Sequence, residues 1–145
     1  MGQLQTIRGS ADFTNSQVIN LGQLQEIGFD ADFRRSKIED LGQLQRIGGN
    51  ANFEGSQITN LSHLKTIGGS ADFRGSQIIN LGQLQSIGGY TDFRDSQIEK
   101  LGQLQEIKGE IKIDKDSKLD FSKIKHGKIV SPEYIKNQFF SSVKN

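Results

Sequence analysis

The chain of 145 residues contains no cysteine, no tryptophan and a single proline. Without cysteine, neither a disulfide nor a thiolate zinc site can stabilise the fold, and nothing about the redox compartment follows. No apolar run approaches the length of about 20 residues that a membrane-spanning helix needs, so we expect no membrane partner. Residues 1–6 lack the basic and apolar segments of a secretory signal, which fits a cytoplasmic chain, but removal of an upstream signal would leave the same sequence. Localisation therefore stays undetermined.

An excess of charge of one sign is also missing. The 18 basic and 17 acidic residues give a formal net charge of +1. Proteins that bind DNA or RNA usually carry a clustered basic surface, and polybasic segments attract anionic membranes. Neither pattern is present, so we expect no nucleic-acid partner.

Catalytic and metal-binding motifs are absent as well. His63 replaces a glutamine of the repeat described below, and His126 has no second ligand near it in the sequence. A zinc site needs three or four convergent ligands, so we expect no metal. No phosphate-binding loop or nucleophile elbow occurs. The prediction is a protein that is not an enzyme, with no catalytic residue and no cofactor.

Glycine, in contrast, is abundant, and an internal repeat explains its 17 copies. The phrase LGQLQSIGGYTDFRDSQIEK at 81–100 recurs, lightly edited, six times over residues 1–121. A fixed period near twenty is typical of solenoid proteins. Each repeat places Leu, Ile and Phe at the same positions, and only stacking of successive coils can bury them. We predict one domain, with six repeats over 1–121 and a C-terminal cap over 122–145.

Within each repeat the spacing of apolar residues changes. Ala71-Asp72-Phe73-Arg74 alternates with a period of two, which predicts a strand, and strands that recur every twenty residues should pair in parallel along the stack. Leu81, Leu84 and Ile87 are three residues apart between glycines. They indicate an extended or 3₁₀-like return path with room for a short second strand at 84–87. The glycine pairs before each main strand mark a corner that needs positive φ or close backbone packing.

The segment Ala71-Asp72-Phe73-Arg74-Gly75-Ser76-Gln77-Ile78 resembles the Leu-x-Leu-x-x-Asn-x-Leu segment of leucine-rich repeats. The resemblance covers residues 1–121. The repeat is similar to the short, twenty-residue bacterial type and also to the coils of receptor L-domains. It implies a mostly β, right-handed solenoid with a parallel sheet along one face. Serine stands at the usual asparagine place, where its hydroxyl could bond neighbouring backbone groups with less reach than an amide.

The two ends of the stack differ. Ser131-Pro132-Glu133 has the N-cap, N1 proline and early acid of a helix start, which predicts a capping helix at about 132–142. The first repeat has no such cap and presents an unprotected edge. We therefore expect a weak homodimer through the N-terminal edge, a surface that comprises Leu4, Ile7, Phe13 and Val18.

The outward positions of the predicted strands form two polar columns, which we call the charged strand face. Leucine-rich repeats usually bind partners through the equivalent positions, whereas the interleaved opposite charges also fit a self-neutralising surface. The charged strand face consists of Asp12, Thr14, Asp32, Arg34, Asn52, Glu54, Asp72, Arg74, Asp92 and Arg94.

Three classes of function are compatible with such a stack. The first, which we favour, is a non-catalytic scaffold that binds a protein partner through the charged strand face. The second is a structural solenoid that self-associates through the N-terminal edge. The third is a ligand lattice, either a DNA mimic or an ice-binding array. A DNA mimic needs strong net acidity and an ice-binding surface needs a flat threonine array, so both fit the composition poorly.

Overall fold

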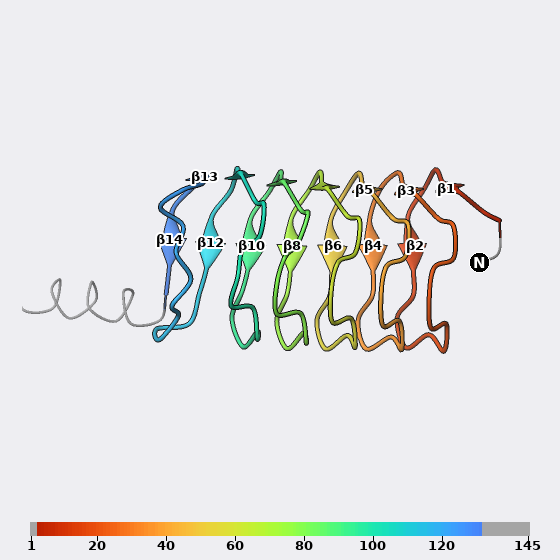
Figure 1. The fold of residues 1–145 in the computed structure, drawn as a ribbon, viewed down its shortest axis with the longest axis horizontal. Coiled ribbons are helices and arrows are strands. Elements are labelled where there is room, and N and C mark those ends of the chain that lie inside the picture. Colours follow the sequence, from red (N-terminus) through yellow and green to blue (C-terminus); the bar gives the residue numbers. More distant parts are fainter. Residues whose placement is uncertain (1–2, 132–145) are drawn as a thin grey trace, which may run out of the picture.

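The computed structural model describes residues 3–131 as a parallel β-solenoid of about six turns (Figure 1). Each coil of twenty residues contributes two strands of two residues. The first strand of each coil belongs to one seven-stranded sheet in the order β1-β3-β5-β7-β9-β11-β13. These strands are β1 (Thr6–Ile7), β3 (Glu26–Ile27), β5 (Arg46–Ile47), β7 (Thr66–Ile67), β9 (Ser86–Ile87), β11 (Glu106–Ile107) and β13 (Lys125–His126).

The second strand of each coil belongs to another parallel sheet of seven strands, in the order β14-β12-β10-β8-β6-β4-β2. Its strands lie side by side along the stack in Figure 1. They are β2 (Ala11–Asp12), β4 (Ala31–Asp32), β6 (Ala51–Asn52), β8 (Ala71–Asp72), β10 (Thr91–Asp92), β12 (Ile111–Lys112) and β14 (Ile129–Val130).

Register is set by the repeat. Along the first six coils, residues twenty apart face one another, as in Ala11 with Ala31 and Asp12 with Asp32. At the last pairings the offset is 19 in the first sheet and 18 in the second. A third line of contact consists of single bridges that join Asn20, Asp40, Asn60, Asn80 and Lys100 in turn. The predicted parallel pairing is therefore present, but it runs along two sheets rather than one face.

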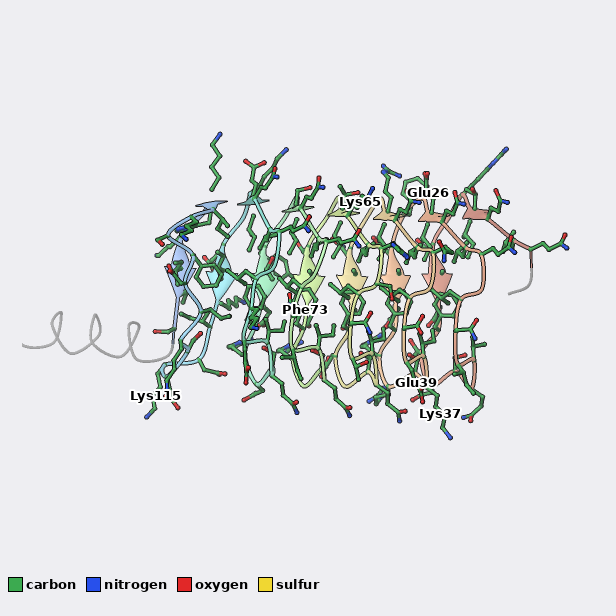
Figure 2. All side chains as sticks on the ribbon, in the orientation of Figure 1. Glu26, Lys37, Glu39, Lys65, Phe73 and Lys115 are labelled. Carbon is green, nitrogen blue, oxygen red and sulfur yellow. The ribbon has the colours of Figure 1, made fainter. Side chains whose placement is uncertain are left out.

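The core is a set of ladders that run along the solenoid axis. Phe33, Phe53 and Phe73 are fully buried, and Figure 2 shows Phe73 inside the stack. Successive phenylalanine rings lie 5.2–5.5 Å apart and within 8° of parallel from Phe13 to Phe93. This spacing lies within the range of offset-stacked aromatic pairs. Each coil thus lends one ring to a continuous column that no single coil could bury.

In the second to fifth coils, two turns use positive φ. Gly82 has φ 59° and its amide is held by the Asn80 side chain at 2.8 Å. The other turn follows the second strand, where Gly75 has φ 65° and Asp95 has φ 54°. The glycine pairs at the corner have ordinary φ, and close packing explains them. A Cβ on Gly69 would lie 2.8 Å from the Gly49 carbonyl carbon and 2.9 Å from the Asn50 nitrogen.

The serine column departs from the expected pattern. Ser36, Ser56 and Ser76 are buried, but their hydroxyl oxygens have no hydrogen-bond partner. At the first coil, in contrast, the Ser16 hydroxyl accepts from the Val18 amide at 3.0 Å. The expected bonding of the serine column to neighbouring backbone is therefore wrong for the three central coils. A hydroxyl at this place is too short to span to the next coil.

The C-terminal end of the described chain continues both sheets. Lys125–His126 pairs with Glu106–Ile107, and Ile129–Val130 pairs with Ile111–Lys112. The predicted capping helix at 132–142 lies outside the described residues, and residues 3–131 contain no helix. Accordingly, no helix in that range is long and apolar enough to cross a membrane.

Candidate functional site

A turn that follows strands β2, β4, β6, β8 and β10 of the second sheet positions the charged strand face. The side-chain oxygen of the polar strand residue accepts a hydrogen bond from the amide two residues later. Asp32 accepts from Arg34 at 3.1 Å, Asn52 from Glu54 at 3.0 Å and Asp72 from Arg74 at 3.0 Å. The Asp-x-Arg spacing therefore folds the arginine stem back over its own aspartate.

Three arginine side chains also donate hydrogen bonds to the aspartate two residues before them. Arg74 donates through Nε at 3.0 Å and through Nη2 at 2.7 Å to the two carboxylate oxygens of Asp72. The pairs Arg34–Asp32 and Arg94–Asp92 have the same forked geometry. Such bidentate pairs are stronger and more directional than single hydrogen bonds.

Longer contacts connect the coils. Arg74 Nη2 lies 3.6 Å from a Glu54 oxygen in the preceding coil, and Arg74 Nε lies 3.6 Å from an Asp92 oxygen in the following coil. A guanidinium thus lies among three carboxylates from three coils. This arrangement supports the self-neutralising interpretation of the two columns, because the guanidinium lies against carboxylates of its own coil and of both neighbouring coils.

The two columns differ in depth. The side chains of Asp32, Asp72 and Asp92 are 27%, 17% and 6% exposed, whereas those of Arg34 and Arg74 are 42% and 40% exposed. A partner that approaches this face therefore meets guanidinium groups first, with the carboxylates beneath them. The sequence placed both columns on the outward face and gave no sign of this difference in depth.

The ion pairs determine the acidity of the deeper carboxylates. Burial alone would raise the pKa of Asp92, but hydrogen bonds from the Arg94 side chain and backbone outweigh it, and the pKa lies below its ordinary value. The same balance, with Arg34 as donor, lowers the pKa of Asp32. Contact with Asp72 is the main cause of a raised pKa of Arg74. Asp32, Asp92 and Arg74 are therefore charged near neutral pH.

The four apolar residues of the N-terminal edge differ in how far they are exposed to solvent. Leu4 is 47% exposed, Ile7 and Val18 are half-buried, and Phe13 is buried with 8% exposure. Within the described chain, β1 and β2 each pair with a neighbour on one side only. The phenylalanine therefore lies inside the first coil, and Leu4 is the residue of this group that reaches solvent most.

A further polar column, which the sequence analysis did not single out, lies at the corner between the two sheets. We call it the corner row. Its members share one role, since each side-chain oxygen accepts from the amide of the residue twenty positions later. The bonds run from Ser10 to Asp30, Asn50, Ser70 and Tyr90, at 2.8–3.1 Å. The signal in the sequence is the run of Ser, Asp and Asn that follows the glycine pairs.

The hollows on the surface of residues 3–131 are lined by scattered polar and apolar side chains and bring no catalytic group of residues together. One of about 200 Å³ lies between the fifth and sixth coils, lined by Phe93, Ile98 and Leu119 with Asp114 and Lys118 nearby. It forms where the sixth coil has an extra residue before Leu119. Over residues 3–131, no group of three or more His, Asp or Glu side chains is placed to hold a metal ion.

Comparison with known proteins gives no match to a family model, to a curated protein or to a solved structure.

Proposed function

We propose that the protein is a non-catalytic scaffold of the leucine-rich-repeat type, which binds a protein partner through the charged strand face. The observation that carries this proposal is the row of half-exposed guanidinium groups held in fixed positions by the aspartates beneath them. Preorganised side chains lose little conformational entropy on binding, which favours affinity. Arginine is also enriched at the centres of protein interfaces.

The assignment to this repeat type rests on side-chain direction. Ala71, Phe73, Ser76 and Ile78, which take the four places of the Leu-x-Leu-x-x-Asn-x-Leu segment, are all buried. The outward place between the first two holds Asp72, as in a strand that offers its outer side to a partner. The unpaired hydroxyl groups of Ser36, Ser56 and Ser76 are a departure from the asparagine version of the repeat.

Site-specific photocrosslinking in cells of the source organism tests the proposal. A photoreactive amino acid replaces Glu54, whose side chain is 46% exposed on the charged strand face. The matched control places it at Gln43, exposed on the other side of the same coil. We expect a discrete protein adduct from position 54 that is lost in the Arg34→Gln, Arg94→Gln double variant. Equal adducts from both positions would contradict the proposal.

A second candidate is self-association through the N-terminal edge. The observation in its favour is Leu4, a large apolar side chain that is 47% exposed beside two edge strands. Edge strands with unpaired backbone groups readily pair with another chain. A two-fold contact between two such edges would close as a dimer. Its test is described in the Discussion.

A further inference from the structure

Two aromatic residues interrupt the corner between the sheets. Phe29 stands at a place that most other coils fill with glycine, and Tyr90 stands where they carry Ser, Asp or Asn. Their side chains are 63% and 50% exposed, which makes them the most exposed aromatic residues of the described chain. Burial does not explain either ring, since neither belongs to the core ladders.

Between the two rings, one column of the corner consists of glycine, beside the column of Asp30, Asn50 and Ser70. The two intervening coils carry the glycine pairs 48–49 and 68–69, and the coil of Tyr90 carries the pair 88–89. Close approach of successive coils leaves no space for side chains there, because a Cβ on Gly69 would lie 2.9 Å from the Asn50 nitrogen. The rings are three coils apart, which at about 4.8 Å per parallel strand is about 14 Å. The corner is thus a smooth strip with an aromatic ring near each end.

Polar groups line this strip at regular intervals. Asp30, Asn50 and Ser70 each use one oxygen to hold the next coil. Among the described residues, the Asn50 amide nitrogen and the second Asp30 carboxylate oxygen have no further hydrogen-bond partner. A row of donors and acceptors with spare capacity, one per coil, therefore runs along the strip from one ring to the other.

At the Tyr90 end of the strip, a lysine ammonium group lies over the aromatic ring. The Lys112 ammonium lies 5.8 Å from the Tyr90 ring centroid, within the range of a cation–π contact. The ring nevertheless stays 50% exposed. The corner row also ends here, because a tyrosine hydroxyl is too far from the backbone to hold the next coil as Ser70 does.

We propose that the strip from Phe29 to Tyr90 binds an extended neutral glycan. Sugar rings stack their C–H faces on aromatic side chains, and their hydroxyl groups exchange hydrogen bonds with carboxylate, amide and hydroxyl groups. The strip offers both kinds of contact in a line. A protein partner would instead need a contiguous apolar centre, and the two rings are separated by bare polar surface. An acidic glycan is disfavoured, because the row carries the Asp30 carboxylate and Glu110 follows Tyr90 in the same column.

The repeat supplies the test variants. Phe29→Gly and Tyr90→Ser each install the residue that neighbouring coils carry at the same place, namely Gly49 and Ser70. Both changes therefore keep the coil geometry. Ile79→Thr is the matched control, since it removes an exposed apolar side chain elsewhere and installs the residue found at Thr59. Thermal unfolding of each variant verifies that the stack is intact.

Isothermal titration of the full chain with cellohexaose and with laminarihexaose is the experiment. We expect at least one of these neutral glucans to bind, the double variant to lose about tenfold or more in affinity, and the Ile79→Thr control to bind as the parent does. Absence of binding to both glucans at millimolar concentration would overturn the proposal, as would equal affinity of the double variant. Capture of peptides on an array through Phe29 and Tyr90, without glucan binding, would assign the strip to a protein instead.

Discussion

At the scale of single residues, Asp92 differs most from what its place in the repeat suggests. Its side chain is 6% exposed and is held by both the backbone and the side chain of Arg94. From sequence it is one of five equivalent polar residues on an outward column. The difference arises because Arg74 of the preceding coil also lies 3.6 Å from this carboxylate, and that contact depends on side-chain conformations that the alternating pattern does not encode.

Stability should therefore depend on the ionisation of Asp92. Because its folded pKa lies below the unfolded value of about 3.9, its contribution is fully present above that pH and disappears as pH falls through the folded pKa. Asp92→Asn should lower the melting temperature at pH 7, whereas the difference between the two proteins should shrink as the pH falls below about 3.9 and the aspartate takes up its proton. Scanning calorimetry across this range measures the difference. A gap that stays constant with pH would show that the charge contributes nothing.

The phenylalanine ladder gives a second prediction at this scale. Phe73 stacks on Phe53 and Phe93, whereas Phe13 stacks on Phe33 alone. Phe73→Ala should cost about 3–5 kcal/mol in unfolding free energy, and Phe13→Ala clearly less, because truncation of a fully enclosed side chain leaves the larger cavity. Urea denaturation of both variants measures the costs. Equal losses would contradict a linear stack in which each coil touches only its neighbours.

At the scale of the coil, the sequence predicted much of the architecture. The alternation in Ala71-Asp72-Phe73 predicted β8 and its relatives, and the apolar spacing left room for a second strand, found at Ser86–Ile87. It did not determine that Ser86–Ile87 and its counterparts, the first strands of their coils, form a sheet of their own, since two residues carry too little pattern. Close packing and positive φ both select glycine, so the sequence alone does not show which of the two explains a corner glycine. Only the atomic positions distinguish the two causes.

Glycine substitutions can separate those two roles in solution. Gly69→Ala should destabilise the fold by about 1–3 kcal/mol, because its methyl group meets the backbone of the preceding coil. Gly9→Ala is the matched change at the same place of the first coil, where a Cβ would have no atom within 4 Å, and should shift stability by less than about 0.5 kcal/mol. Thermal unfolding followed by circular dichroism compares them. A neutral Gly69→Ala would refute close packing as the reason for the glycine.

At the scale of the whole molecule, the strip from Phe29 to Tyr90 adjoins the charged strand face, because the Lys112 ammonium over the Tyr90 ring belongs to β12, which pairs with β10 of that face. Figure 2 shows Glu26 and Lys65 along the side of the first sheet and Lys37 and Glu39 along the opposite side, with the core between them. The sequence identified the charged strand face and the N-terminal edge from column composition. It missed the strip at the corner, because Phe29 and Tyr90 belong to different columns and come together only when the coils are stacked.

Self-association provides a test at this scale. If the N-terminal edge forms a two-fold contact, light scattering should show a rising dimer fraction with concentration, and Leu4→Lys should abolish it by placing a charge in the contact. Ile79→Lys, a change of another exposed apolar residue, should leave the dimer unaffected. A strict monomer at high concentration would leave the charged strand face and the corner strip as the interaction surfaces.

The in-register stack has a mechanical consequence. Each coil advances the chain by only about 4.8 Å along the axis, the spacing of parallel strands, although its twenty residues span about 66 Å or more when extended. A pull on the two ends would load the coils one after another, since each is held by its immediate neighbours. Under tension the chain would then lengthen more than tenfold in equal steps, one coil at a time. When the load is removed, coils can fold again onto the remaining stack.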